Sequence, residues 1–587
     1  MPTINQLPRL DSLASGDQLP VYATAQGDSR RMSVELLQDY MQDNLNLNMA
    51  IETLPSIGDV QAADTIPSFD ASTSSQRKML VSQLQTYMQN NLNLPDNSDE
   101  VNFLQAGAGA VTRTVQSKLR ETLSIVDFGA VAGVDIAAAL NAAITAAKVS
   151  GNADVFIPAG SWTLLTSPAA LDNTTSLRIF GAGPNKTSIW VGANNVTVFS
   201  LTKVCARVAI DSMWIGSSAA RTNTTAISVV GTSYSAPCSA IQIDNIKIQN
   251  INNPFVWTDV HQSFASRVVI VQTVASAVTG NCMALKNIVT CTLRDCFIFT
   301  TTGTFAQDCV LLLDDNDSVI LDGFNVLDGQ YGYRIRNVAG STGTRLSRLI
   351  NCYAESCTAA GFYQEGICRD IRLIGCHSAV NASDGFWISG GKSVSLTDCF
   401  SIQNNGHGYY IQSGSNIKLL GCEATNNSQI SDVSRDGIYV STSNVRVIGC
   451  RSGDYMFTLA NRQRYGLTIA AASDYVFEAS NDLSGNTTGP LNYASTEANN
   501  QIEYRFQGSK TYDPGSLSDG QGETTTVTVS GARLGDYASA SFSLNISGIT
   551  LTAYVSANDT VTVRFQNESG GTVDLASGTL RAIVRKA

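Results

Sequence analysis

The stretch LIGCHSAVNASDGFWISGGKSVSLTDCFSIQNNGHGYYIQSGSNIKLLGC (373–422) contains one short pattern twice. A Leu-x-x-Cys motif recurs every 23 residues, and each cysteine is followed by an asparagine and then by a glycine with a bulky apolar residue after it. From about 310 to 480 these markers return at intervals of 23 to 29 residues. The marker cysteines are Cys352, Cys376, Cys399, Cys422 and Cys450, and the glycines are Gly361, Gly385, Gly408, Gly437 and Gly466. A fixed period of this length in strand-like sequence predicts a solenoid, and a right-handed parallel β-helix fits best.

Stacked coils place equivalent residues in columns, about 4.8 Å apart. Asn381, Asn404 and Asn427 form such a column, and we expect them to make hydrogen bonds along the stack at a turn. The residues directly after the glycines alternate with further apolar residues, so they are expected to point inward. This inward set is Phe362, Phe386, Tyr409 and Ile438.

The residue after each inward one must point outward, and on four successive coils it is aromatic. These residues are Tyr363, Trp387, Tyr410 and Tyr439. Exposed aromatic rings at this spacing are costly unless something covers them. Two covers fit equally well: a trimer interface, or a saccharide whose apolar ring faces stack on the side chains, because aromatic residues are enriched in both kinds of contact.

Directly before the glycines lies a second column, Asp384, His407 and Asp436. Asp-Gly is a common turn dipeptide, so each residue taken alone is typical of a turn. Catalysis is favoured because two carboxylates flank an imidazole beside the aromatic residues. The strand spacing puts Asp384 and Asp436 roughly 9.6 Å apart, and inverting glycosidases separate their carboxyls by about 6.5–9.5 Å. We predict both as catalytic carboxylates, with His407 orienting water or tuning a pKa.

Glu423 is a competing catalytic residue, because it lies just after the cysteine column at an outward position, with His377 two coils before it. A lyase is a third possibility. In a lyase, a tyrosine, histidine or arginine would abstract a proton next to a uronate carboxylate that Arg435 neutralises. The sequence leaves these alternatives open.

Loop length increases on one side of the stack. The marker cysteine precedes its glycine by nine residues in three coils, but by fifteen and sixteen in the last two. The insertions at 426–436 and 452–464 emerge beside the acidic column, and long loops on one face of a solenoid build a binding wall. The groove residues that they would contribute are Asp432, Arg435, Asp454, Arg462 and Arg464. The arginines would supply the positive charge that an anionic polysaccharide needs.

The first hundred residues contain an internal repeat. Residues 4–47 align without gaps with residues 51–94, at a constant offset of 47. Each copy joins an extended, turn-rich segment to a short amphipathic helix. Units this small need a neighbour to bury their apolar faces. We therefore predict two small α+β attachment modules, at 1–50 and 51–100, that dock to each other, to other subunits or to a larger assembly.

Three further segments carry a resemblance. VNFLQAGAGAVTRTVQSKLRE (101–121), SIVDFGA (124–130) and VFIPAGSWTLL (155–165) are similar to the neck and opening coil of bacteriophage tailspike proteins of the pectate-lyase-like superfamily. DFGA and PAGSW stand on either side of a helical stretch, 137–148. The resemblance implies a neck helix at 101–123, a β-helix at 124–504 that binds polysaccharide, and a homotrimer.

The C-terminal part alternates in period two between Gly, Asn and Asp turns. This pattern predicts a small antiparallel β-sandwich at 505–587. The region resembles a terminal module of many phage tail proteins, which implies a role in trimerisation or in sugar binding.

Composition excludes several functions. The formal net charge of -11 and a pI near 4.9 argue against a nucleic-acid or anionic-membrane surface. No run of about 18 apolar residues predicts a transmembrane helix. MPTINQLPRL (1–10) lacks the pattern of a signal peptide, so we expect synthesis in the host cytosol. The thirteen cysteines form no CxxC pair, so we expect buried thiols, no metal site and no cofactor.

The sequence thus predicts a mainly β protein, and the resemblance implies a phage tailspike that joins other tail or baseplate proteins through its N-terminal repeats. At the outer surface of the host cell it would bind a capsular or O-antigen polysaccharide and cleave it as an endo-acting glycosidase. A polysaccharide lyase, a non-cleaving receptor-binding spike and a structural tail component are the alternatives, because one fold can host all of these functions.

Overall fold

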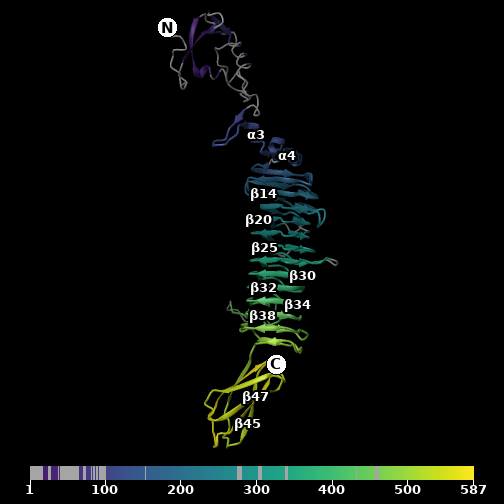
Figure 1. Ribbon diagram of the computed structural model, residues 1–587, viewed down its shortest axis with the longest axis vertical. Helices are drawn as coiled ribbons and strands as arrows, with labels where there is room; N and C mark the ends of the chain where they lie inside the picture. The colour runs from purple at the N-terminus through teal and green to yellow at the C-terminus, as the bar shows by residue number, and fades with distance from the viewer. Residues whose placement is uncertain are drawn as a thin grey trace. The chain divides into compact units, whose positions relative to one another are not determined.

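The structure is a computed structural model. It describes residues 18–23, 28–37, 39, 65–70, 75–80, 82, 86, 90, 101–151, 154–273, 280–301, 307–337, 341–430, 433–455 and 462–587. The chain divides into two compact units, Met1–Arg120 and Glu121–Ala587, which are coloured from purple to yellow in Figure 1.

In the first unit both copies of the sequence repeat form a hairpin. The strands are β1 (Gln18–Ala23), β2 (Asp28–Ser33), β3 (Thr65–Asp70) and β4 (Ser75–Leu80). They form one antiparallel sheet in the order β2-β1-β3-β4, so the two copies pair with each other through β1 and β3. Residues 34–37 and 39 are helical, as the amphipathic pattern predicts, and the rest of that helix lies outside the described residues. The role of the repeats in attachment stays a prediction.

The end of the first unit contains a short helix where the sequence predicts a neck. The elements are β5 (Asn102–Phe103), β6 (Arg113–Thr114) and α3 (Val115–Leu119). Helix α3 begins after Thr114, whose hydroxyl accepts a hydrogen bond from the Ser117 amide at 3.0 Å. This N-cap satisfies one of the amides that the first turn leaves unpaired.

The second unit opens with a helix that covers the first coil. β7 (Thr122–Ser124) and the 3-10 helix η2 (Ile125–Phe128) precede α4 (Ala137–Ser150), and β8 (Asp154–Ile157) and β9 (Gly160–Leu164) follow. Leu140, Ala143, Ile144 and Ala147 are buried at helical spacing, so one face of α4 packs on the core. The helical stretch predicted at 137–148 is confirmed.

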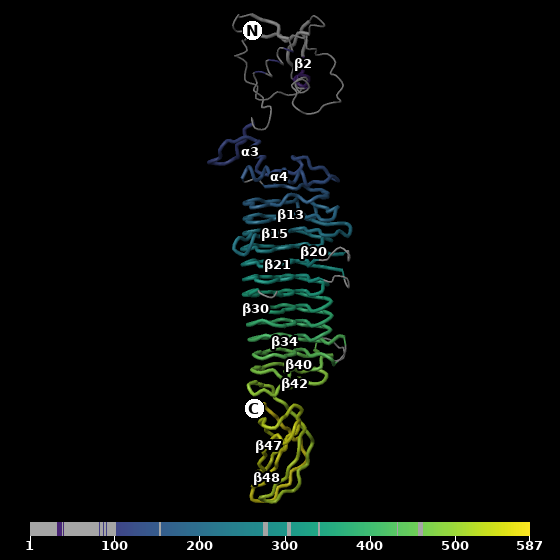
Figure 2. The backbone as a smooth tube through the Cα atoms, turned by 90° about the vertical axis from the view of Figure 1, so that its right-hand side faces the viewer, coloured from purple at the N-terminus to yellow at the C-terminus, as the bar shows by residue number. Residues whose placement is uncertain are grey.

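From residue 171 to residue 502 the chain winds into stacked coils of short parallel strands (Figure 2). The strands are β10 (Leu171–Asp172), β11 (Thr175–Gly181), β12 (Thr187–Val191), β13 (Thr197–Thr202), β14 (Ala206–Gly216), β15 (Thr225–Val230), β16 (Cys238–Ser239), β17 (Gln242–Gln249), β18 (Asn253–Thr258), β19 (Val260–His261), β20 (Phe264–Gln272), β21 (Met283–Lys286), β22 (Thr292–Arg294), β23 (Phe297–Thr300), β24 (Val310–Leu313), β25 (Ile320–Asp322), β26 (Asn325–Leu327), β27 (Tyr333–Arg336), β28 (Arg348–Ile350), β29 (Tyr353–Glu355), β30 (Phe362–Ile374), β31 (His377–Ala379), β32 (Phe386–Thr397), β33 (Phe400–Ile402), β34 (Tyr409–Ser415), β35 (Ile417–Leu420), β36 (Glu423–Thr425), β37 (Ile438–Val440), β38 (Val445–Ile448), β39 (Arg451–Ser452), β40 (Tyr465–Ile469), β41 (Phe477–Ala479), β42 (Gly489–Tyr493) and β43 (Gln501–Ile502). The parallel β-helix that the repeat predicts is confirmed.

In the coils that carry the repeat, strand pairing creates three faces. Face 1 contains β24, β27, the first parts of β30 and β32, β34, β37 and β40. Face 2 contains β25, β28, the last parts of β30 and β32, β35, β38 and β41. Face 3 contains β23, β26, β29, β31, β33, β36 and β39. Equivalent residues of successive coils therefore lie side by side.

The core of these coils consists of columns of identical or similar side chains. On face 1 the rings of Tyr333, Phe362, Phe386 and Tyr409 stack in sequence, with centroids 4.7, 4.7 and 4.9 Å apart. All thirteen cysteines are buried and free, which confirms the predicted buried thiols. The thiol of Cys399, for example, contacts the carbonyl oxygen of Leu373 in the preceding coil at 3.5 Å.

The asparagine column forms a buried ladder of hydrogen bonds, as predicted. Nδ2 of Asn381 donates to Oδ1 of Asn404 at 2.8 Å, and Nδ2 of Asn404 donates to Oδ1 of Asn427 at 2.9 Å. In the coil with the long insertion, Gln463 takes the place of asparagine and accepts from Asn427 at 2.8 Å. Gln463 then donates to Asn486 at 3.0 Å, so the ladder continues past the insertion. Buried amides need such partners.

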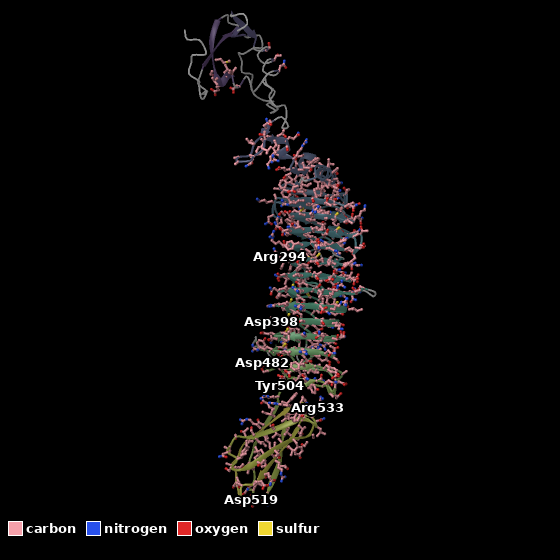
Figure 3. All side chains as sticks on the ribbon, in the orientation of Figure 1. Arg294, Asp398, Asp482, Tyr504, Asp519 and Arg533 are labelled. Atoms are coloured by element: carbon pink, nitrogen blue, oxygen red, sulfur yellow. The ribbon has the colours of Figure 1, made fainter. Side chains whose placement is uncertain are left out.

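The C-terminal residues form two three-stranded antiparallel sheets, β44-β49-β46 and β45-β48-β47. The strands are β44 (Phe506–Tyr512), β45 (Gly522–Thr528), β46 (Tyr537–Phe542), β47 (Ile549–Ala557), β48 (Thr560–Asn567) and β49 (Gly578–Arg585). Phe565 contacts Tyr512 and Phe542 of the other sheet, each with ring centroids 5.5 Å apart. Arg533, labelled in Figure 3, donates to the backbone oxygen of Ser495 at 2.6 Å.

Among the described residues, no helix is long and apolar enough to cross a membrane.

The asparagine ladder generates a stability prediction. Asn404 is fully buried, so Asn404→Ala leaves the Asn381 amide and one proton of its Nδ2 without their acceptor and removes the hydrogen bond to Oδ1 of Asn427. Because each unsatisfied buried group costs about 1–3 kcal/mol, we expect the free energy of unfolding to fall by about 2–4 kcal/mol in chemical denaturation. Asn405→Ala is the matched control, since that neighbouring side chain lies outside the ladder and is only half-buried. Equal denaturation midpoints for the two variants would show that the ladder does not stabilise the solenoid.

Candidate functional site

Face 1 carries the predicted aromatic column on its outer side. Tyr363, Trp387, Tyr410 and Tyr439 are in register, and each is half-buried while its neighbours along the strand are buried. Successive ring centroids are 4.4, 5.9 and 5.6 Å apart. Nε1 of Trp387 donates to Oε1 of Gln412 at 2.9 Å, which fixes the indole ring. The outward orientation agrees with the sequence, whereas the role in binding stays a prediction.

A cavity of about 530 Å³ opens beside the C-terminal end of this column. Its lining combines aromatic, acidic and basic groups from the turns and from the first long loop. The lining residues are Ala382, Ser383, Asp384, Asn405, Gly406, His407, Tyr410, Ile430, Ser434, Arg435, Tyr439 and Arg464. The structure thus brings together Asp384, His407, Arg435 and two of the predicted aromatic residues.

Asp384 lines the cavity from the turn before β32. Its side chain is 7% exposed, and Oδ1 accepts a hydrogen bond from the His407 amide at 2.7 Å. Burial raises the pKa of Asp384 to about 6, while the hydrogen bond and the charge of Arg435 partly offset this rise. The carboxyl can therefore change its protonation close to neutral pH.

His407 is held in one neutral form. Its Nδ1 accepts a hydrogen bond from the Asp436 amide at 3.0 Å, so the proton of the neutral ring sits on Nε2. The ring packs between Tyr410 and Tyr439, with centroids 5.5 and 4.8 Å away. Burial lowers the pKa of His407 to about 4. At neutral pH His407 is therefore a hydrogen-bond donor to the cavity rather than a base.

The structure corrects the predicted catalytic role of Asp436. Its side chain is completely buried, and its two oxygens accept hydrogen bonds from Nε and Nη2 of Arg464, each at 2.8 Å. Oδ1 also accepts from the Tyr465 amide at 3.2 Å. A carboxylate enclosed in this way cannot activate water beside Asp384. Asp436 is in the predicted column, but it joins two coils and positions Arg464 at the cavity wall.

Of the groove residues predicted in the two long loops, Arg435 and Arg464 line this cavity, and Arg435 is exposed. Asp454 instead connects the two loops, because its carboxylate accepts hydrogen bonds from the amides of Asn426 at 2.8 Å, Gln463 at 2.9 Å and Arg462. Neither Asp454 nor Arg462 lines the cavity, so the prediction that they face the groove is wrong for this cavity. Asp432 lies outside the described residues.

Glu423 and His377 lie on face 3, away from the cavity lining. Oε2 of Glu423 accepts a hydrogen bond from the hydroxyl of Tyr455 at 2.6 Å. The guanidinium of Arg451 in turn lies 3.4 Å from the centroid of the Tyr455 ring. Glu423 is therefore part of a separate cluster and does not share a site with Asp384.

A further group of residues, which the sequence markers do not reveal, lies at the N-terminal end of the aromatic column on face 1. Tyr331 stacks on Tyr363 with centroids 4.9 Å apart, and the guanidinium of Arg334 lies 4.9 Å from the Tyr331 ring. Arg334 bridges two carboxyls: its Nη1 lies 3.5 Å from Oδ2 of Asp308, and its Nη2 lies 2.7 Å from Oε1 of Glu365. Burial raises the pKa of Asp308. Asp308 lies in the column of Asp384, but a cysteine rather than a glycine follows it, so the repeat markers do not reveal it.

Comparison with known proteins agrees with the geometry. The family model described as a right handed beta helix region matches residues 287–452. The tailspike protein of E. coli bacteriophage HK620 in complex with a pentasaccharide is a similar solved structure, with 12% identity and a TM-score of 0.53 over 85% of this chain and 100% of that chain. The chain has the fold of phage tailspike proteins.

A second solved tailspike gives the same result. Tailspike protein 3 of bacteriophage CBA120 has 14% identity and a TM-score of 0.53, over 82% of this chain and 83% of that chain. None of the curated protein sequences matches the chain significantly. The predicted resemblance to right-handed β-helix tailspikes is thus confirmed in the fold.

The ion pair of Asp436 and Arg464 can be tested by stability. Arg464→Met leaves a fully buried carboxylate without its partner, which typically costs about 3–5 kcal/mol of unfolding free energy. The double variant Asp436→Asn with Arg464→Met removes that charge and should recover part of the loss. Arg435→Met is the control, because this exposed arginine of the same cavity should change stability by no more than about 0.5 kcal/mol. Equal stability of Arg464→Met and Arg435→Met would contradict the structural role.

Proposed function

We propose that the protein is a phage tailspike that binds a bacterial capsular or O-antigen polysaccharide along face 1. The observation that carries this proposal is the unbroken series of aromatic ring contacts on the outer side of face 1 from Tyr331 to Tyr439, with carboxyls and arginines at both ends. Sugar rings present apolar faces that stack on aromatic rings, and their hydroxyls need the polar groups around them. The likeness in fold to a tailspike solved with a pentasaccharide supports the same ligand class.

The charged side chains of the cavity indicate which class of polysaccharide it would bind. The protein as a whole is acidic, yet Arg435 and Arg464 line the cavity beside Asp384. Arg464 is neutralised by Asp436, so Arg435 is the arginine whose charge remains available to a ligand. A polysaccharide with a carboxylate or another acidic substituent therefore fits this end of the groove best.

The wider assembly belongs to the same proposal. The N-terminal repeats attach the protein to the virion tail through other tail or baseplate proteins, three chains associate, and the β-helix meets its ligand at the outer surface of the host cell. The pairing of the two repeat hairpins into one sheet makes the two copies of the repeat a single folded element.

For cleavage we propose hydrolysis at the carboxyls that flank Arg334. Hydrolysis of a glycosidic bond needs one protonated carboxyl for the leaving oxygen and one carboxylate for the water. Arg334 contacts both carboxyls, but burial raises the pKa of Asp308 and so favours its protonated form, whereas Glu365 lies closer to Arg334 and also pairs with Arg336. A pair of carboxyls in such different environments is the arrangement from which an acid and a base are assigned.

A second candidate reaction, elimination, is favoured by the cavity at Asp384. Among the described residues that line this cavity, Asp384 is the one carboxyl. In a uronate-containing chain Arg435 would bind the carboxylate, and Asp384 would take the proton from C5. The C4–O4 bond then breaks, a C4–C5 double bond forms, and the proton passes to the leaving oxygen. One residue can serve both steps.

Three variants separate these reactions. On the purified host polysaccharide we expect Asp308→Asn and Glu365→Gln to lose at least about a hundredfold in the release of reducing ends, as removal of a general acid or base typically does. Asp384→Asn should retain this activity, and no absorbance should appear at 235 nm. Asp398→Asn is the control, because this exposed carboxyl lies at another corner of the coil (Figure 3).

Other results with these variants would identify a different reaction, or none. New absorbance at 235 nm that only Asp384→Asn abolishes would replace hydrolysis by elimination. Binding without any new chain ends would make the protein a non-cleaving receptor-binding spike. Neither outcome would affect the assignment of the groove, which the next variant tests.

Binding itself should depend on the aromatic column. Trp387→Ala removes the central ring, and loss of a central aromatic contact costs roughly 2 kcal/mol, or about thirtyfold in Kd. Titration calorimetry with the host polysaccharide fragment would measure the change. Tyr537→Ala is the control, since Tyr537 is 72% exposed in the C-terminal sheets. Unchanged affinity of Trp387→Ala would exclude face 1 as the binding surface.

A further inference from the structure

Face 3 carries a second column of outward side chains that the proposed groove does not use. Phe297, Asn325, Tyr353, His377 and Phe400 are in register on successive coils. Asn325 and His377 are exposed, and the three aromatic residues are half-buried. The imidazole of His377 lies between two rings, with centroids 6.4 Å from Tyr353 and 5.5 Å from Phe400.

This column borders a cavity of about 480 Å³. The lining places two aromatic rings beside two amides, an imidazole and a carboxylate. The lining residues are Phe297, Asn325, Leu327, Asn351, Cys352, Tyr353, Glu355, Gly375 and His377. None of them lines the cavity of face 1. The two cavities are thus separate sites on different faces of the solenoid.

The polar groups of this cavity are arranged to meet hydroxyls. The Tyr353 hydroxyl donates to Oε2 of Glu355 at 2.6 Å, which fixes the ring and leaves Oε1 of the carboxylate as an acceptor. Asn325 and Asn351 each offer an amide with both donor and acceptor atoms, and both are exposed. Small-molecule sites typically combine aromatic walls with a few convergent polar groups of this kind.

Charge distinguishes the two cavities. The lining at Tyr353 contains a carboxylate and no lysine or arginine, whereas the lining at Asp384 contains two arginines. An acidic saccharide would meet an uncompensated like charge at Glu355, which is unfavourable. An uncharged saccharide can stack on the rings, donate its hydroxyls to the Glu355 carboxylate and exchange hydrogen bonds with the two amides without this penalty.

We propose that the cavity formed by Phe297, Tyr353 and His377 on face 3 is a second carbohydrate-binding site, which takes a neutral saccharide. This inference rests on the proposed function only for the class of ligand, a saccharide. It assigns that ligand to a different face of the solenoid and requires it to be uncharged. A second copy of the chain is a poorer occupant, because the centres of protein interfaces are closely packed and depleted of charged residues, while this hollow is lined by amides and a carboxylate.

The test uses the full-length protein on an array of neutral oligosaccharides built from hexoses, deoxyhexoses and N-acetylhexosamines, followed by titration calorimetry with the strongest binder. Asn325→Ala changes an exposed side chain, so its folding should be unaffected, and it accompanies Tyr353→Ala. We expect both variants to bind the neutral oligosaccharide at least tenfold more weakly. Trp387→Ala, on face 1, and Arg372→Ala, an exposed control on face 2, should bind it as the unmodified protein does.

Each other outcome overturns the inference. If the unmodified protein binds no neutral oligosaccharide, or if Asn325→Ala and Tyr353→Ala bind it unchanged, face 3 has no such site. If Trp387→Ala alone weakens the binding, the neutral ligand occupies face 1. If Asn325→Ala or Tyr353→Ala alters the molecular mass in solution, the surface is a contact between chains. Binding of the host polysaccharide, measured in parallel, tests face 1 separately.

Discussion

The in-register stacking of parallel strands is the constraint on which the rest of this structure depends. Each coil pairs with the next at the same positions, so a residue type chosen at one position is repeated as a column through the molecule. Apolar columns fill the interior, as in the stack from Tyr333 to Tyr409. Columns that point outward become continuous surfaces, and the aromatic groove of face 1 is one of them.

The same constraint determines where a site can form. A coil cannot change its backbone path without losing the pairing on both sides, so variation is confined to the turns. At the longest insertions the chain keeps the ladder intact by using Gln463 in place of asparagine, and it ties the loops down through Asp436, Arg464 and Asp454. These polar contacts position the turns from which Arg435 and Asp384 line one cavity.

The sequence predicted features that repeat, because a periodic pattern reveals a column. The coil period, the inward rings, the asparagine ladder and the outward aromatic residues all came from the spacing of the markers. The sequence could not show that Arg464 returns from the next coil to enclose Asp436, since the conformation of a long loop has no periodic signal. Arg334 was missed because Phe324 stands where later coils carry the marker cysteine, although Gly332 is at the glycine position and Arg334 is at the position of Tyr363.

The two titrating groups of the face 1 cavity respond to pH in opposite directions. The folded protein raises the pKa of Asp384 to about 6, so the stability that its protonated form contributes is present below the unfolded pKa and is lost as the pH rises through 6. The pKa of His407 is lowered to about 4, so the stability from its neutral form is present above about 6.5 and is lost as the pH falls toward 4. Between pH 4 and 6 both groups are predominantly uncharged, and the charge of Arg435 is the dominant one in the cavity. Above pH 6 the Asp384 carboxylate faces Arg435, and an acidic ligand must then compete with it. We infer that the affinity of this cavity for an acidic polysaccharide is higher on the acidic side of pH 6.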